Sequence, residues 1–218
     1  MPQSKTLVLI PSSLELDIVR RQTELKHFLT EAATTISLEV SGVGILSAAI
    51  TASRLIERQQ PQHVVLFGIA GTYDEDRATV GQAYLFPSVS CFGFGVGQGT
   101  NFRPWETTEL AAVAPCEREI GLQFPDTLRD ETAKGSLISV AAVSNDADEV
   151  NSIRKHYPSA IAEDMEGFAV ASACQSFAIP CTVIRGISNV AGQRDKAHWQ
   201  IESALASACQ LLVRFLGT

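Results

Sequence analysis

Polar residues stand where several strand-like apolar runs of the sequence end. In open α/β sheets, ligands bind beyond the carboxyl ends of the strands, where such groups meet. We therefore expect these groups to share one small-molecule site. They are Ser12, Ser13 and Glu15 after TLVLI, Gly68 and Gly71 in HVVLFGIAG, the acids of AEDMEG, and Arg185, Ser188 and Asn189 in IRGISN.

Each of these residues also has a structural interpretation. Glu15 could be an acid in the first turn of a helix, and Glu166 could be a charge at the start of another helix. The glycines could simply form a turn, without a role in a site, and Asn189 could cap the turn after its strand. Arg185 could be a buried ion-pair partner of Asp164 or Glu163. The joint occurrence at strand ends favours a site.

The elements that position these groups alternate along the chain. β-rich runs at residues 6–10, 36–40, 63–71, 80–89, 136–143 and 181–188 predict strands. Helical periodicity predicts helices within residues 14–29, 45–59, 146–157, 166–178 and 198–216. This alternation is typical of repeated βα units and a largely parallel sheet. Residues 91–125, rich in glycine and aromatic residues, predict a long loop that acts as a lid or a subunit interface.

Composition limits the partners. The chain has 218 residues, 45% hydrophobic and 19% charged, which is typical of a folded α/β protein. Its net charge of −7 argues against nucleic acid, which requires a basic surface. Only a short apolar run precedes Pro11, so we expect no signal peptide, no membrane partner and a cytoplasmic location.

Familiar cofactor and metal motifs are missing from the sequence. The five cysteines and four histidines are dispersed, so we expect reduced thiols and no metal. Glycines 93, 95, 97 and 99 do not form GxGxxG, and there is no GxxxxGK[ST], GxSxG or HExxH. We expect no cofactor.

Four stretches carry a family resemblance: SGVGILSAAI, HVVLFGIAG, YPSAIAEDMEGFAVASAC and IRGISN. Together they resemble the purine nucleoside phosphorylase and nucleosidase superfamily, and within it the methylthioadenosine/S-adenosylhomocysteine nucleosidase branch. The similarity covers nearly the whole chain. The DME tripeptide followed by R-x-I-S-[DN] is specific to that superfamily. LEL at residues 14–16, with IRGISN, Arg194, Asp195 and Trp199, is most similar to the futalosine hydrolase subfamily.

This resemblance implies a fold and a reaction. The fold would be one α/β domain over residues 1–218, with a central twisted mixed sheet between helices in three α/β/α layers. The reaction would be hydrolysis of the N-glycosidic bond of futalosine, giving hypoxanthine and dehypoxanthine futalosine in menaquinone biosynthesis. The resemblance also implies a purine nucleoside ligand and a homo-oligomer, a dimer or larger.

Roles follow for individual residues that match the family motifs. Glu15 matches the water-activating glutamate, and Glu166 matches the acid that binds the ribose 2′- and 3′-hydroxyls. Asn189 would recognise the base, supported by Ser188 and Arg185. Trp199 would stack in the pocket or pack in the core. The remaining expected contacts with substrate are Val43, Ala70, Gly71, Val143, Ser144 and Met165.

Phosphate could replace water as the attacking group, but the first strand-end loop argues against it. A phosphate site favours glycine and arginine, and IPSSLELD has neither. The carboxylate of Glu15 would also repel the anion. The sequence therefore favours hydrolysis.

Asn189 stands where adenine-cleaving relatives carry aspartate. A 6-oxopurine presents acceptors at N7 and O6, and an asparagine NH₂ offers two donors, so the amide suits hypoxanthine. The enzyme alternatives are methylthioadenosine/S-adenosylhomocysteine nucleosidase and purine nucleoside phosphorylase. The non-enzyme alternative is a nucleoside-binding protein.

Overall fold

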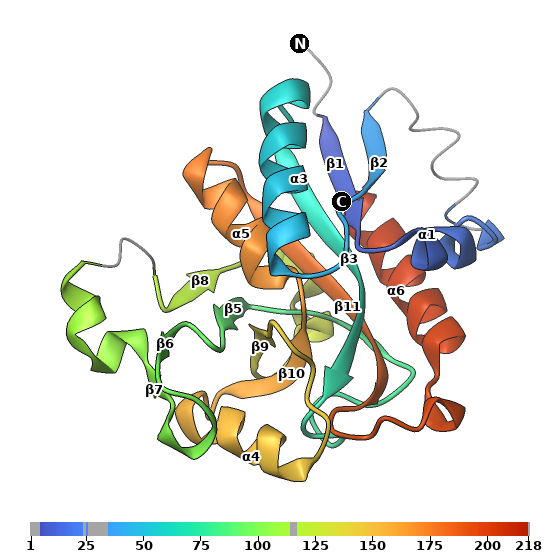
Figure 1. Ribbon diagram of the computed structural model, residues 1–218. Helices are drawn as coiled ribbons and strands as arrows, with labels where there is room; N and C mark the ends of the chain where they lie inside the picture. Colours follow the sequence, from blue (N-terminus) through green and yellow to red (C-terminus); the bar gives the residue numbers. More distant parts are fainter. Residues whose placement is uncertain (1–4, 24, 26–34, 114–116, 218) are drawn as a thin grey trace.

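The computed structural model describes residues 5–23, 25, 35–113 and 117–217 (Figure 1). Nine of its strands form one sheet with the order β2-β1-β3-β10-β9-β5-β8, and β11 pairs with both β3 and β4. The sheet strands are β1 (Thr6–Ile10), β2 (Ile36–Val40), β3 (His63–Thr72), β4 (Ala83–Leu85), β5 (Ser88–Cys91), β8 (Glu119–Gly121), β9 (Ser136–Ser139), β10 (Ala160–Asp164) and β11 (Cys181–Val190).

The sheet is mixed, as the family resemblance implied. β1, β2, β11 and the first part of β3 run parallel, whereas β10 is antiparallel to the end of β3. The last residues of β3 thus lie between β10 and β11. This arrangement brings residues from three strands together at one place.

Helices cover both faces of the sheet, and alternate residues of β1 show the layers. Leu7 and Leu9 pack in the cluster that contains α3 (Ile45–Gln59) and α5 (Gly167–Ser176). Val8 and Ile10 pack in the cluster that contains α1 (Ser13–Val19) and α6 (Ile201–Leu216). Figure 1 shows these helices on either side of the sheet. The three-layer α/β/α fold is confirmed.

Several predicted boundaries were wrong. The expected strand at 80–89 is two strands, because the chain turns at Phe86–Pro87 and β5 pairs with β9 instead of β11. The strand expected at 136–143 ends at Ser139. The helix expected from His198 begins at Ile201, after a short 3₁₀ turn at Lys196–His198. Part of the helix expected within residues 14–29 lies outside the described residues.

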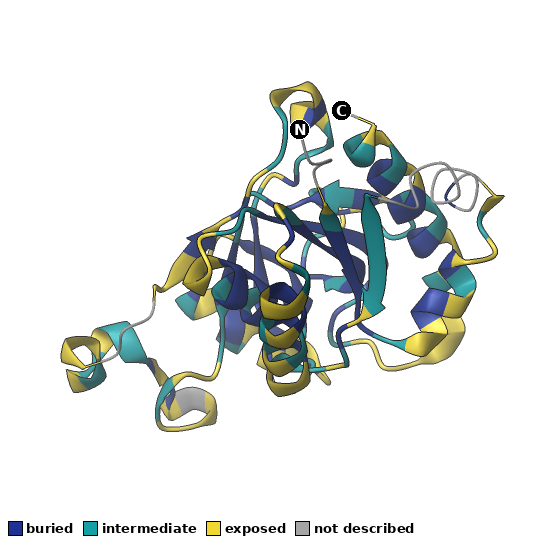
Figure 2. Cartoon of the chain, turned by 90° about the horizontal axis from the view of Figure 1, so that it is seen from above, coloured by how far each residue is buried: buried dark blue, intermediate teal, exposed yellow. Residues whose placement is uncertain are grey.

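The segment after β5 is more ordered than the long loop that the sequence predicted. It contains the hairpin of β6 (Gly95–Val96) and β7 (Arg103–Pro104), short 3₁₀ helices, and β8, which extends the main sheet. Aromatic pairs hold the hairpin, including Phe94 with Trp105 at 5.8 Å between ring centroids. Figure 2 shows much of this segment projecting from the body with exposed residues. Its role as a lid or an interface stays a prediction.

The helices begin and end for identifiable reasons. Ser12 caps α1, since its hydroxyl accepts from the Glu15 backbone N–H at 3.2 Å. Asp146 caps α4 (Ala147–His156) in the same way, accepting from the Asp148 and Glu149 N–H groups. Gly44 precedes α3 with a φ of +89°, a conformation that favours glycine. The cap of α1 places Glu15 one turn beyond the end of β1.

Candidate active site

A cavity of about 260 Å³ lies where β1, β3, β10 and β11 end. Ten of the twelve residues that the sequence predicted for the site line it. These are Glu15, Val43, Ala70, Gly71, Val143, Met165, Glu166, Ser188, Asn189 and Trp199. The cavity therefore gathers residues that are far apart in the sequence, as expected for strand ends that meet.

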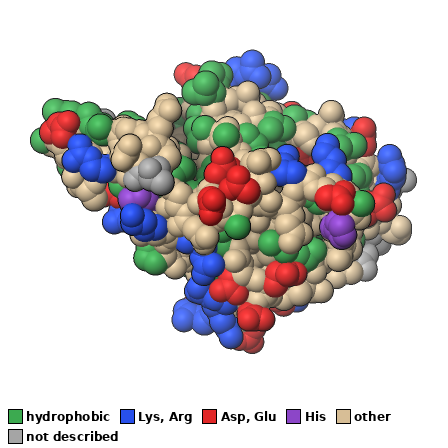
Figure 3. Space-filling model, turned by 60° about the horizontal axis from the view of Figure 1, so that its bottom comes forward, with side chains coloured by type: hydrophobic (Ala, Val, Ile, Leu, Met, Phe, Trp, Pro, Cys, Tyr) green, Lys and Arg blue, Asp and Glu red, His purple; other side chains and the backbone are tan. Residues whose placement is uncertain are grey.

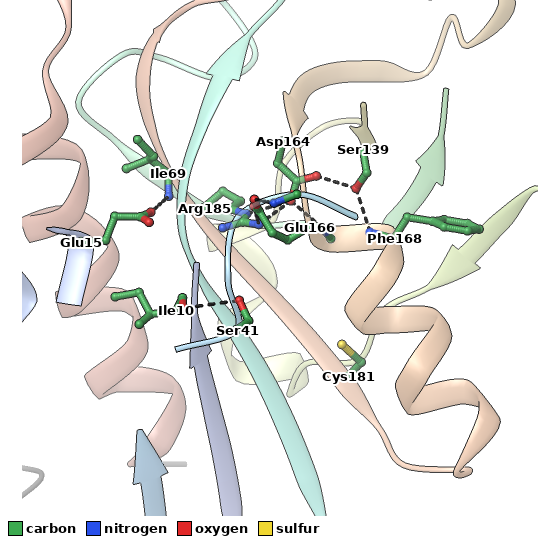
Figure 4. Close-up of polar contacts among 12 residues, drawn as sticks. Ile10, Glu15, Ser41, Ile69, Ser139, Asp164, Glu166, Phe168, Cys181 and Arg185 are labelled. Carbon is green, nitrogen blue, oxygen red and sulfur yellow. Dashed lines mark hydrogen bonds and ion pairs between the residues drawn. The ribbon is translucent and has the colours of Figure 1, made fainter. Parts of the chain in front are cut away.

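Glu15 does lie in the first turn of α1, but its side chain is not a solvated helix charge. The residue is only 6% exposed. The Ser12 hydroxyl donates to its Oε2 at 2.6 Å, and the Ile69 backbone N–H donates to its Oε1 at 3.2 Å. These donors fix the orientation of the carboxylate, which lines the cavity (Figure 4).

Arg185 is fully buried behind the cavity and joins two carboxylates. Its Nε and Nη2 donate to Asp164 Oδ2 at 3.0 and 2.5 Å, and Nη2 also donates to Glu166 Oε2 at 3.0 Å. Of its two expected partners, Asp164 is confirmed, whereas the pairing with Glu163 was wrong. Figure 4 shows the guanidinium between Asp164 and Glu166. Arg185 thus holds Glu166 in place from the side opposite the cavity.

Asp164 anchors this network. Its Oδ1 accepts from the Ser139 hydroxyl at 2.5 Å, and its Oδ2 accepts from the Gly167 N–H at 2.8 Å in addition to Arg185. The Ser139 oxygen in turn accepts from the Phe168 N–H at 2.8 Å. Asp164 therefore ties β9, β11 and the start of α5 together, which fixes the position of Glu166 at the N-cap of that helix.

Glu166 faces the cavity with both carboxylate oxygens held. Oε1 accepts from the Gly44 N–H at 2.9 Å, and Oε2 accepts from Arg185. Burial raises the pKa of Glu166 above its usual value of 4.5, although the charge of Arg185 and the Gly44 N–H oppose the rise. Each oxygen keeps a lone pair that could accept a hydroxyl hydrogen.

Gly68 lies where Glu15 and Arg185 approach each other. A Cβ at this position would lie 2.5 Å from Arg185 Nη1 and 2.8 Å from Glu15 Oε1. Nη1 is buried and has no hydrogen-bond partner among the described residues. An unpaired guanidinium N–H and a carboxylate oxygen therefore lie close to one point, and only a residue without a side chain leaves that point open.

Asn189 also lines the cavity and is 9% exposed. The Ser188 hydroxyl donates to Asn189 Oδ1 at 2.7 Å, and Asn189 Nδ2 donates to the Val190 carbonyl at 2.9 Å. These bonds set the orientation of the amide. They also correct the expectation of two free donors, since the bond to Val190 uses one of the two Nδ2 hydrogens.

The walls of the cavity are mainly apolar, with an aromatic and a cation at its rim. Trp199 is half-buried, so the alternative of a core indole was wrong. Its Nε1 donates to the Gln193 carbonyl at 3.2 Å, and the Arg194 guanidinium carbon lies 5.1 Å from the ring centroid. Arg194 also lines the cavity. The sequence analysis named Arg194 as part of the family resemblance, but it did not predict that Arg194 lines the cavity.

Ser144 does not line this cavity. It is buried, and both its backbone N–H and its hydroxyl donate to Glu163, at 2.9 and 2.6 Å. Tyr73 donates its hydroxyl to Glu163 at 2.7 Å. Glu163 itself lines the cavity together with Asp164, as expected for the acids of AEDMEG. Pro11, Ile69 and Arg194 also line it, and the sequence did not place these three there.

Three further features describe metal ligands, helices and surface charge. They contain no cluster of three or more potential metal ligands of the His, Cys, Asp and Glu types. Within the same part of the chain, no helix combines the length and apolar character that crossing a membrane requires. On the face shown in Figure 3, lysine and arginine side chains lie in separate groups interspersed with acidic ones.

Comparison with known proteins identifies the family. The family model described as the phosphorylase superfamily matches residues 14–217, so the chain belongs to this superfamily. Among solved structures, futalosine hydrolase from Helicobacter pylori is similar with a TM-score of 0.78 and 16% identity, over 98% of this chain and 97% of that one.

Two nucleosidase structures have a similar fold. The 5′-methylthioadenosine/S-adenosylhomocysteine nucleosidase from Neisseria meningitidis, in complex with methylthio-immucillin-A, gives a TM-score of 0.73 at 19% identity over 98% of both chains. The corresponding enzyme from Colwellia psychrerythraea 34H, in complex with adenine, gives 0.73 at 21% identity over 99% of this chain and 96% of that one. These similarities show a shared fold.

Proposed function

We propose that the protein hydrolyses the N-glycosidic bond of a purine nucleoside whose base is a 6-oxopurine, with futalosine as the substrate. The observation that carries the proposal is the set of side chains that line the cavity at the strand ends. A carboxylate held by Ser12 and Ile69, a second carboxylate paired with Arg185, and a primary amide all face it. In this order, the three groups are suited to activate the attacking water, to bind the sugar and to bind the base.

Water activation is the role proposed for Glu15. Its carboxylate would accept a proton from the water as the water attacks the anomeric carbon, which is general-base catalysis. Arg185 supports this site from behind the cavity, where its Nη1, which has no partner among the described residues, lies near the same point over Gly68 as Glu15 Oε1.

Sugar binding is the role proposed for Glu166. Departure of the base leaves positive charge on the ribose ring, as in glycoside hydrolysis. A carboxylate that accepts from the 2′- and 3′-hydroxyls stabilises that charge more in the transition state than in the substrate. Gly44 and Arg185 hold Glu166 in advance, so little reorganisation is needed. Met165 would form the apolar wall of the sugar site.

Base recognition is the role proposed for Asn189. Ser188 occupies the amide oxygen, which leaves one Nδ2 hydrogen to donate to the acceptors of the base, N7 and O6. The amide cannot transfer a full proton, so it would stabilise the departing base by hydrogen bonding alone. Trp199, Val143, Ala70 and Gly71 would surround the base and sugar.

Hydrolysis is favoured over phosphorolysis by the charge near the attacking position. Glu15 lies there with its carboxylate directed to the cavity, and Ile69 contributes its backbone N–H to Glu15. A phosphate dianion would meet that carboxylate, whereas a neutral water molecule would be bound by it. A phosphorylase therefore remains an alternative that the geometry disfavours.

The finer assignments rest on several supports. The sequence resembles the futalosine hydrolase subfamily, and the fold is that of the Helicobacter pylori futalosine hydrolase. A role in menaquinone biosynthesis and a cytoplasmic location follow from that proposed substrate. The proposed homo-oligomer is supported by exposed apolar side chains on α3, where Leu46 is 79% and Ile50 is 68% exposed.

A substrate panel tests the proposal. The protein is incubated with inosine, futalosine, aminofutalosine and methylthioadenosine, with and without phosphate, and base release is measured. We expect hypoxanthine release to be fastest from futalosine and unaffected by phosphate. Faster release from methylthioadenosine would favour the adenine-specific nucleosidase, and a requirement for phosphate would favour the phosphorylase. A single stoichiometric release without turnover would favour the binding protein.

A further inference from the structure

The loop of residues 191–200 forms part of the rim of the cavity, and the proposed reaction leaves its arginine without a role. This rim loop connects the end of β11 to the start of α6. Arg194 and Trp199 of the rim loop both line the cavity. Trp199 is half-buried, whereas Arg194 is exposed. The rim loop therefore places one positive charge where the cavity meets the solvent.

Hydrogen bonds hold both ends of the rim loop to the sheet. At its start, the Ala191 N–H donates to the Thr72 carbonyl of β3 at 2.8 Å. At its end, the Gln200 N–H donates to the Ser188 carbonyl of β11 at 2.7 Å. The loop thus leaves and rejoins the strand ends that form the cavity. The fold therefore sets the position of Arg194 next to the site.

The Arg194 guanidinium packs on an aromatic ring and has no acidic partner. Its carbon lies 5.1 Å from the Trp199 ring centroid. The neighbouring acid, Asp195, is used elsewhere, since its Oδ1 accepts from the Ala197 N–H at 3.0 Å and its Oδ2 lies 3.2 Å from His198 Nδ1. No residue in the described part of the chain forms a hydrogen bond or ion pair with Arg194. Its N–H donors are therefore available to a ligand.

The other charges of the cavity give this free cation a function. The acids that line the cavity are Glu15, Glu163, Asp164 and Glu166. Arg185 is already paired with two of them and is fully buried. Acids alone would repel a ligand with an anionic group, and a complementary charge at the rim removes that repulsion. Arg194 is placed to supply that charge.

A nucleoside has one position from which an anionic group can reach the rim. Under the proposed function, Asn189 binds the base and Glu166 binds the 2′- and 3′-hydroxyls, so the 5′ substituent is the part that remains. We propose that Arg194 binds a carboxylate on the 5′ substituent, with Trp199 holding the guanidinium in place. This inference rests on the proposed function, and it adds a residue that selects the 5′ substituent.

Two features favour a carboxylate over a phosphate. The planar guanidinium can form two parallel hydrogen bonds with a carboxylate. A carboxylate carries one negative charge, which a single arginine neutralises, whereas a phosphate monoester carries nearly two. The second charge of a phosphate would face the acids of the cavity.

Futalosine and its methyl ester test the proposal. The two compounds share the base, the sugar and the aromatic ring of the 5′ substituent, but only the acid has a carboxylate. The experiment measures kcat/KM for hypoxanthine release from both compounds by the wild type, Arg194→Gln, Arg194→Lys and Lys196→Gln. Lys196 is an exposed cation of the rim loop and is not among the residues that line the cavity, so its variant controls for the loss of one charge.

We expect Arg194→Gln to reduce the preference for the acid over the ester by about 10-fold, the low end for a hydrogen bond to a charged group, because the arginine is exposed. Activity on the ester should stay near the wild-type value. Arg194→Lys should keep part of the preference, since the charge stays but the paired donors are lost. Lys196→Gln should keep the wild-type ratio. An unchanged ratio in Arg194→Gln, or an equal fall in Lys196→Gln, would overturn the proposal.

A second measurement uses the wild type alone. Salt screens exposed charges, so the preference for the acid over the ester should decrease as sodium chloride is added. A preference that does not depend on salt would overturn the proposal. Failure of the proposed function is distinct, because the wild type would then release hypoxanthine from neither compound. Cleavage of both compounds with a ratio that Arg194→Gln leaves unchanged would remove only the role of Arg194.

Discussion

The two ends of the cavity are held by different forces. At one end, Arg185 is paired with Asp164 and Glu166, and all three are buried. At the other end, Ser188 and Asn189 are held by neutral hydrogen bonds. Buried ion pairs are costly to break because one charge is left unpaired, whereas a neutral bond costs less to exchange. Under the proposed function, the charged end carries out bond cleavage and the neutral end selects the base.

The largest effect is expected at the charged end, from Glu15→Gln. Loss of the general base should lower kcat by on the order of 10² to 10⁴, while the folded structure is kept. The amide oxygen can still accept the Ile69 N–H that now binds Oε1. Steady-state kinetics measures kcat, and thermal unfolding checks that the variant keeps its folded structure. Near-normal turnover would remove Glu15 from the mechanism.

Glu166→Gln should cost roughly 2 to 4 kcal/mol of transition-state stabilisation, as for a preorganised electrostatic group. This variant also weakens the pairing with Arg185, so kinetics on one substrate cannot separate sugar binding from structure. A 2′,3′-dideoxy nucleoside provides the control, because it lacks the hydroxyls that Glu166 would bind. Equal losses on both substrates would make the residue structural.

At the neutral end, Asn189→Asp should change selectivity. A carboxylate would place an oxygen against the Val190 carbonyl and against the acceptors of a 6-oxopurine. We expect kcat/KM for a hypoxanthine nucleoside to fall by roughly 10², and activity on the 6-amino analogue to hold or rise. The informative quantity is the ratio of the two rates. If that ratio is the same in the variant, Asn189 does not recognise the base.

The smallest expected effect is a shift in the pH dependence. Glu166 must be ionised to stabilise the sugar cation, and burial raises its pKa. As the pH falls through this raised pKa, the group takes up a proton and kcat/KM decreases. We therefore expect the acid limb of the profile to lie above pH 4.5. Under the same account, Glu166→Gln should remove that limb, and a limb that persists in the variant would have to come from another group.

The sequence predicted most of the charged end because its residues follow strands directly. Glu15 comes one helical turn after β1, and Glu166 follows β10, so periodicity and strand ends sufficed to place both. The ion-pair partners of Arg185 were harder to predict, since an arginine within an apolar strand has several potential partners. The structure selects Asp164 and Glu166 because both project towards β11 from the end of β10.

The neutral end depended on pairing between distant strands, which periodicity does not reveal. Asn189 lies beside Gly71 only because β11 pairs with the last residues of β3. The register between β11 and β3 also shifts between Ile187 and Asn189. The same limit applies to β5 and β8, whose partners are set by the turn at Pro87.

Cleavage in ¹⁸O-labelled water tests the central claim most directly. The wild-type protein is incubated with futalosine or inosine in phosphate-free labelled water, and the products are analysed by mass spectrometry. We expect hypoxanthine and a free sugar that carries one ¹⁸O atom, with the same rate after phosphate is added. A sugar 1-phosphate that forms only with phosphate, or no cleavage of either nucleoside, would contradict the account.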